Sequence, residues 1–170
     1  MDIQANQDVF ILIILFGILA LVFFRGRRKR KAEPYRIAYI GHSETADNAG
    51  EAFRTTFGDM LPDDPAGAVL LRVSLMNRSD TPVAPEEFLR PVIVTLPEDS
   101  RVLLARAAQS SSSVAPETVA VQTRLNQVEI APFPMPNRSS MIFNIVVDGP
   151  ATPYAVDGAF QQQARLEPLE

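Results

Sequence analysis

The feature that most constrains this chain is an uninterrupted apolar run near its N-terminus. Residues 9–24, VFILIILFGILALVFF, are sixteen residues without a charged or polar side chain. A helix of that length spans about 24 Å, so interfacial residues on both sides must complete a crossing of the ~30 Å hydrocarbon layer. We therefore expect a transmembrane helix at 9–24. A buried helix of a soluble protein is one alternative. A cleaved signal peptide fits less well, because such peptides carry positive charge before the apolar run.

The apolar run is followed by a dense basic cluster. Six cations occur within seven residues, namely Arg25, Arg27, Arg28, Lys29, Arg30 and Lys31, whereas the short leader at residues 1–8 carries two aspartates. Cationic flanks are held on the cytoplasmic side, so we expect a bacterial inner-membrane protein with its N-terminus outside and its C-terminal domain in the cytoplasm. The juxtamembrane collar at 25–33 is also expected to attract anionic lipid headgroups, by roughly 1 kcal/mol per charge. The bilayer is thus the first predicted partner.

Composition removes most catalytic and metal-binding classes. The chain has no Cys and one His, so thiolate chemistry, zinc ribbons, iron–sulfur clusters and multi-histidine sites have no ligands. Residues 32–170 contain ten of the sixteen basic residues and eighteen of the twenty acidic residues, which gives that part a net charge of about -8. An acidic body is repelled by phosphate backbones, so nucleic-acid binding is not expected. We expect no enzyme activity, no cofactor and no metal.

The region 34–170 reads as a mainly β domain. The best period-2 pattern lies at 68–76, where Val69, Leu71, Val73 and Leu75 alternate with the other face. Fourteen prolines and scattered polar turns separate other short apolar runs. These features predict an antiparallel β-sandwich of about seven or eight strands. The expected strands are 34–40, 68–76, 91–96, 101–107, 119–125, 127–131, 141–147 and 159–166, with a short helix around 50–57.

Isolated polar motifs carry little chemistry. His42 lies beside Ser43 and Glu44, but sequence neighbours rarely form a catalytic triad and no GxSxG elbow is present. Paired carboxylates occur next to prolines or in turns, where solvated acids accumulate. The Asn-Arg-Ser sequences at Asn77 and Asn137 match the glycosylation pattern, and at the ends of strands they favour turns.

Two segments carry a resemblance to a known group. Residues 77–91 read NRSDTPVAPEEFLRP, with Asn77, Pro82, Val83, Glu87, Phe88 and Pro91 at the matching positions. Residues 136–140 and the strand MIFNIVVDG that follows are similar to an Asn-Pro-Gly-Asp turn and its strand. The pattern resembles that of uncharacterised bacterial membrane-linked proteins and covers roughly residues 68–165. Arg78, Ser79 and Arg138 stand where glycine or proline is more usual. The resemblance implies a β-sandwich and no assigned activity.

Two proline-rich segments are candidate interaction loops. Phe88 follows Pro82 and Pro85, while Phe133 and Met135 alternate with prolines in the sequence PFPMP. Phe88 could close an open end of the sandwich, and the second segment is either an exposed ligand or a crossing whose apolar side chains pack inward. We favour the structural interpretation and keep Phe88, Phe133 and Met135 as a possible interaction loop.

These observations favour a membrane-anchored interaction module that binds a protein. We expect it to be an accessory or scaffold component of a membrane-associated assembly. The alternative is an extracytoplasmic sensor or ligand-binding domain, or a hydrolase, that would use the acids Asp59, Asp63, Asp64, Glu86 and Glu87.

Overall fold

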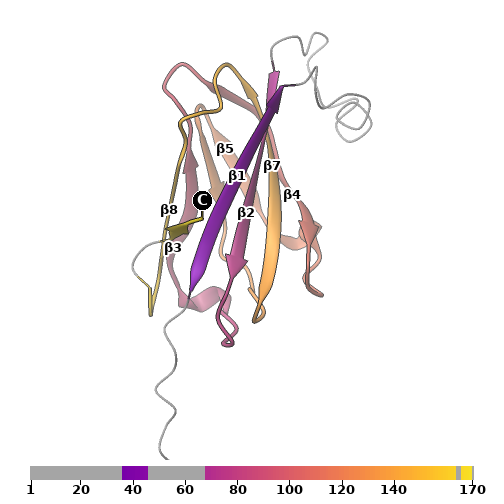
Figure 1. Ribbon diagram of the computed structural model, residues 1–170, viewed down its shortest axis with the longest axis vertical. Coiled ribbons are helices and arrows are strands. Elements are labelled where there is room, and N and C mark those ends of the chain that lie inside the picture. Colours follow the sequence, from indigo (N-terminus) through magenta and orange to yellow (C-terminus); the bar gives the residue numbers. More distant parts are fainter. Residues whose placement is uncertain (1–35, 46–67, 164–165, 170) are drawn as a thin grey trace, which may run out of the picture. The chain divides into compact units, whose positions relative to one another are not determined.

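The computed structural model describes residues 36–45, 68–163 and 166–169 of the chain. These residues form nine β-strands in two sheets and two short 3₁₀ helices, and the mainly β sandwich predicted from the sequence is confirmed (Figure 1). The predicted leader, membrane span and collar lie outside the described residues, as does the helix expected around 50–57. Among the helices that the structure describes, none has the length and apolar character needed to cross a membrane.

One sheet has five strands in the order β4-β7-β2-β1-β9. All pairs are antiparallel except that of β1 with β9. The period-2 pattern that predicted a strand at 68–76 forms the central β2, which pairs along its whole length with β7. The bounds are β1 Ile37–Thr45, β2 Ala68–Asn77, β4 Arg101–Ser110, β7 Ser139–Asp148 and β9 Glu167–Pro168.

The second sheet has four antiparallel strands in the order β5-β6-β3-β8. A two-residue turn joins β5 to β6, and Leu125 at its first position has a positive φ of 48°. The connections contribute the 3₁₀ helices η2 (Pro85–Glu87) and η3 (Pro116–Thr118). The strands are β3 Phe88–Thr95, β5 Val121–Arg124, β6 Gln127–Ile130 and β8 Ala155–Phe160.

The main core lies between the two sheets. Inward-facing residues of β2 and β7, such as Leu71, Val73 and Phe143, are fully buried and pack in one cluster with Val92 and Val128 of the other sheet. Burial of such side chains supplies the dominant favourable term in folding. The alternating residues of β2 and β7 point away from this core and form the outer face of the five-stranded sheet.

Two expected strand positions are corrected by the structure. The strand expected at 34–40 runs instead over 37–45, because Gly41–Thr45 continue to pair with β2. The strand expected at 159–166 ends at Phe160, where Gln161–Gln163 form a turn. The side-chain amide of Gln163 accepts a hydrogen bond from the Ile37 N–H at 2.6 Å and donates one to the Ile37 carbonyl at 2.9 Å. This side chain thereby occupies the place of a strand partner.

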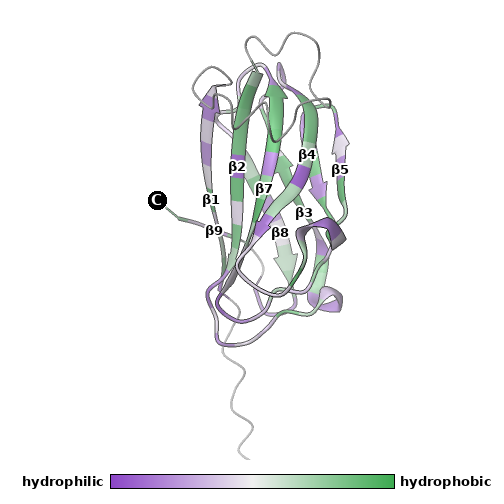
Figure 2. Cartoon of the chain, turned by 90° about the vertical axis from the view of Figure 1, so that its right-hand side faces the viewer, coloured by the Kyte–Doolittle hydropathy of each residue, from purple (hydrophilic) through white to green (hydrophobic). Residues whose placement is uncertain are grey.

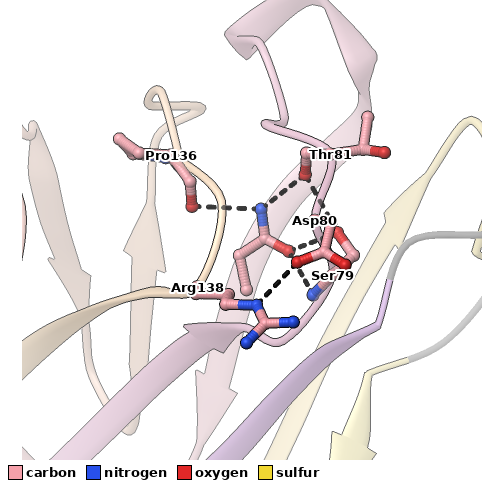
Figure 3. A network of polar contacts seen from close by, with 6 residues as sticks. Ser79, Asp80, Thr81, Pro136 and Arg138 are labelled. Carbon is pink, nitrogen blue, oxygen red and sulfur yellow. Dashed lines mark hydrogen bonds and ion pairs between the residues drawn. The ribbon is translucent and has the colours of Figure 1, made fainter.

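Asn77 holds together the turn that follows β2. Its Nδ2 donates to the carbonyls of Thr81 and Pro136 at 2.9 and 3.1 Å, and its Oδ1 accepts from the Ser79 N–H at 3.0 Å (Figure 3). The same Nδ2 donates to the Met135 carbonyl at 3.1 Å. Only 1% of the Asn77 surface is exposed. Because it hydrogen-bonds to carbonyls of two distant segments, this one buried amide stabilises the junction between them.

An exposed ion pair lies beside that amide. Arg138 Nε donates to Asp80 Oδ1 at 2.6 Å, and the hydrogen bond together with the guanidinium charge lowers the pKa of Asp80 (Figure 3). Arg138 has a φ of 50°, in the left-handed region that glycine enters most easily. This is one of the positions where the resembled pattern has glycine or proline, and the chain adopts the left-handed turn without them.

Candidate binding groove beside strand β4

Cross-strand pairing places a row of polar side chains across the outer face of the five-stranded sheet. His42 of β1 is opposite Arg72 of β2, Arg72 is opposite Asn144 of β7, and Asn144 is opposite Arg106 of β4. We call these four residues the polar band. Directly opposite side chains lie about 5 Å apart at their Cβ atoms, so the four form one continuous surface. Polar segments interrupt the hydrophobic strands β7 and β4 on this face (Figure 2).

The carboxylate of Glu44 lies beside one end of the polar band. Glu44 lies 3.1 Å from His42 Nε2 and 4.0 Å from Arg72 Nη2. The Arg72 side chain remains 48% exposed, so the longer of these contacts leaves much of its guanidinium accessible. Such an exposed pair contributes little to stability, and its cation can still bind another acceptor.

A groove of about 920 Å³ covers the other end of the band and extends beyond β4. The helix η3 and the start of β5 form its far wall. The residues that line this β4 groove are Arg72, Ala105, Arg106, Ala107, Ala108, Gln109, Pro116, Glu117, Val119, Val121, Ile142 and Asn144. They come from five separate parts of the chain, which explains why no sequence motif marked the groove.

Asn144 is the one buried polar side chain in this groove with an atom that lacks a hydrogen-bond partner. It is 8% exposed, and its Oδ1 accepts no hydrogen bond. Among the described residues no other buried side-chain oxygen or nitrogen is left in this state. An unpaired buried acceptor typically costs about 1–3 kcal/mol, and such an exception calls for an explanation. The oxygen itself is shielded from solvent just below the groove wall, so a bound molecule can supply the missing donor once the Asn144 side chain turns toward the groove.

The residues expected to form an interaction loop lie elsewhere, and their side chains are in the core. Phe88, Phe133 and Met135 are 8%, 4% and 2% exposed. Phe88 packs against Phe133 with ring centroids 6.0 Å apart, and the N–H of Met135 donates to the Val83 carbonyl at 2.9 Å. The inward-packed crossing is therefore confirmed, and the correction is that these three side chains are not available to a partner on the surface.

Prolines near these side chains do form a shallow depression of about 680 Å³. Pro82, Pro85, Pro134 and Pro136 line it together with Glu86 and Glu87. The Ala84 N–H donates to Glu87 Oε2 at 2.7 Å, so this carboxylate closes the first turn of η2. No buried side-chain oxygen or nitrogen of the residues lining this depression is without a partner, which distinguishes it from the β4 groove.

The acids weighed for a hydrolase or sensor are not brought together in the described part. Glu86 is exposed and Glu87 caps η2, whereas Asp59, Asp63 and Asp64 lie outside the described residues. No group of three or more potential metal ligands occurs within the described ranges. The basic residues at 25–31 that were assigned to topology also fall outside the described part of the chain.

The fold defines the class of this protein as a two-sheet β-sandwich. Comparison of the chain with protein-family models and with curated proteins finds no match. The site must therefore be interpreted from its own geometry.

Proposed function

We propose that this chain is a single-pass membrane-anchored interaction module whose β-sandwich binds a protein partner through the β4 groove. It would serve as an accessory or scaffold component of a membrane-associated assembly. The apolar run at 9–24 supports the anchor, and the basic collar at 25–33 supports an outside N-terminus and a cytoplasmic sandwich.

The observation that carries the proposal is that Asn144 Oδ1, on the wall of the β4 groove, accepts no hydrogen bond. Folding buries this acceptor at a cost, and a partner that donates a hydrogen bond there recovers that cost only in the complex. The adjoining guanidinium of Arg72 offers donors for an acceptor on the same partner. A β-sandwich can present such a groove without any cofactor.

Site-specific photo-cross-linking in native membranes tests this function. A photoreactive residue replaces Gln109, which is exposed at the groove, and a control replaces Leu89 on β3 of the other sheet, which is 65% exposed. We expect a discrete cross-linked protein from position 109 and none from position 89. The cross-link should weaken in the background of Asn144→Leu. Equal cross-linking at the two positions, or no effect of Asn144→Leu, would contradict the proposal.

Topology is tested separately, because the chain has no cysteine of its own. A single cysteine at Ser113, an exposed position between β4 and η3, should resist a membrane-impermeant thiol reagent in intact cells. A cysteine at Asn6 in the leader should react. Labelling at Ser113→Cys but not at Asn6→Cys would reverse the orientation and support the extracytoplasmic sensor instead.

A further inference from the structure

Strand β4 has one edge without a strand partner in its sheet. It stands at the end of the strand order and pairs only with β7. On its other side, the Val102 N–H donates to the Leu125 carbonyl at 2.8 Å near the start of the strand. Five consecutive residues, 105–109, line the groove. Side chains alternate along a strand, so an unbroken run of lining residues means that the main chain itself borders the groove.

Two bulges limit where another strand could pair with this edge. The register of β4 against β7 shifts between Val102 and Leu104 and again between Ala107 and Gln109. Bulges interrupt regular ladders and are one way in which proteins protect exposed edges from unwanted pairing. Between them the register is regular from Leu104 to Ala107. This stretch accommodates about four residues of a partner strand, or roughly 14 Å.

The two faces of this short stretch differ in chemistry. Arg106 is on the outer face beside Asn144, whereas Ala105 and Ala107 pair opposite the core residues Ile145 and Phe143 and so face inward. The far wall on the inward side includes the buried Val119. A strand laid beside β4 would therefore place one set of alternating side chains next to Leu104 and the guanidinium of Arg106, and the other set next to small apolar groups.

We infer that the β4 groove binds an extended partner segment that pairs with the main chain of Leu104–Ala107 as an added strand. Its outward side chain beside Arg106 is acidic, and its inward side chains are apolar and face the alanines. The small alanine side chains leave room for those apolar groups. This mode of recognition derives affinity from main-chain hydrogen bonds and specificity from alternate side chains. The inference rests on the proposed function and names the chemistry of its partner.

Titration of the full-length chain in lipid nanodiscs tests the inference. The probe is a terminally blocked heptapeptide that alternates valine and glutamate, and the readout is the backbone amide resonances of ¹⁵N-labelled alanines. We expect shifts at Ala105 and Ala107, with Ala131, which directly follows β6, and Ala159 of β8 as internal controls. A peptide with lysine in place of glutamate should bind about two- to five-fold more weakly, the range expected for one exposed ion pair.

Two variants separate strand pairing from general attraction. Arg106→Glu should reverse the preference, so that the lysine peptide binds more tightly than the glutamate peptide. Methylation of the peptide nitrogens that face β4 should abolish the shifts, because it removes the main-chain donors while keeping the side-chain pattern. Unchanged binding of the methylated peptide, no shift at Ala105 and Ala107, or an Arg106→Glu variant with the original preference would each overturn the inference.

Failure of the inference can be distinguished from failure of the proposed function. A protein cross-linked through position 109 in a manner that depends on Asn144, without any peptide response, would keep the interaction function and reject strand pairing. A peptide response that obeys the charge reversal, without a cross-linked protein in membranes, would keep the groove chemistry and reject the proposed assembly role.

Discussion

Two asparagines on the five-stranded sheet should respond in opposite ways to the same substitution. Asn77 and Asn144 are both buried, at 1% and 8% exposure, but only Asn77 has its amide satisfied. Leucine has the same number of heavy atoms as asparagine and no polar atom. Asn77→Leu and Asn144→Leu therefore form a matched pair that differs mainly in the hydrogen bonds lost.

For Asn144→Leu, the main change is the removal of an acceptor that has no donor. Relief of part of the 1–3 kcal/mol typical for such an atom should raise the free energy of unfolding by about 1 kcal/mol. For a domain of this size that corresponds to a rise in melting temperature of about 3–5 °C. Because the groove is open, the larger side chain has space to extend without displacing core residues.

For Asn77→Leu, the carbonyls of Thr81, Met135 and Pro136 lose a shared donor, and the Ser79 N–H loses its acceptor. Each of the three carbonyls keeps one other donor, from Ser79 Oγ, the Val83 N–H and Ser139 Oγ, whereas the Ser79 N–H is left without its acceptor. At about 1 kcal/mol for each hydrogen bond lost, we expect a loss of about 3 kcal/mol. Thermal unfolding of the purified full-length chain, followed by circular dichroism in mild detergent, measures both variants under identical conditions.

The sign of the Asn144→Leu effect decides the argument. A loss of more than about 1 kcal/mol would mean that the asparagine makes a stabilising hydrogen bond in the free protein. The groove would then have no unmet acceptor, and the proposed function would lose its main support. A gain in stability combined with weaker cross-linking from position 109 would show that the residue is retained for binding at a cost to folding.

Three further predictions concern local features of the sandwich. Leu125→Gly should stabilise the chain by about 1 kcal/mol, because Leu125 combines a φ of 48° with 83% exposure; Leu125→Ala, which keeps the backbone strain, is the control for thermal unfolding. The Asp80–Arg138 pair should stabilise the folded chain above the unfolded carboxyl pKa of about 3.9, and this stability should be lost as the pH falls through the lower pKa of folded Asp80. Asp80→Asn should therefore reduce the dependence of the melting temperature on pH in this acidic range. Gly41→Ala places a methyl group where the Tyr154 hydroxyl lies, so the tyrosine should be displaced toward solvent. Since burial is the main cause of the raised pKa of Tyr154, an ultraviolet titration should find that pKa shifted down toward about 10.

Much of the fold could be predicted because side-chain alternation is a local signal. The pattern from Val69 to Leu75 predicted β2 at its observed position, since one face of this strand must be buried. The end of the chain was less predictable. The side chain of Gln163 replaces a strand partner by binding Ile37, a residue 126 positions away, and no local pattern encodes such a contact.

The candidate groove was not predictable from the sequence. Its polar centre joins Arg72, Arg106 and Asn144, which lie far apart along the chain and meet only through the register of β2, β7 and β4. Phe88 and Phe133 were ambiguous in the sequence because apolar residues among prolines are typical of both exposed ligands and packed crossings. The distinction depends on tertiary packing, and here the two rings pack against each other inside the sandwich.

The charge of the domain and the charge of the groove act at different ranges. Residues 32–170 carry eighteen acidic residues against ten arginines, so the overall charge of this part disfavours acidic partners. At physiological ionic strength that repulsion is screened beyond about 8 Å, whereas a carboxylate beside Arg106 lies well within this distance. We therefore expect an acidic segment to bind as a strand only where a guanidinium lies beside a main-chain edge without a strand partner. The β4 groove provides that combination, and the acidic surroundings then act against the same segment binding elsewhere on the domain.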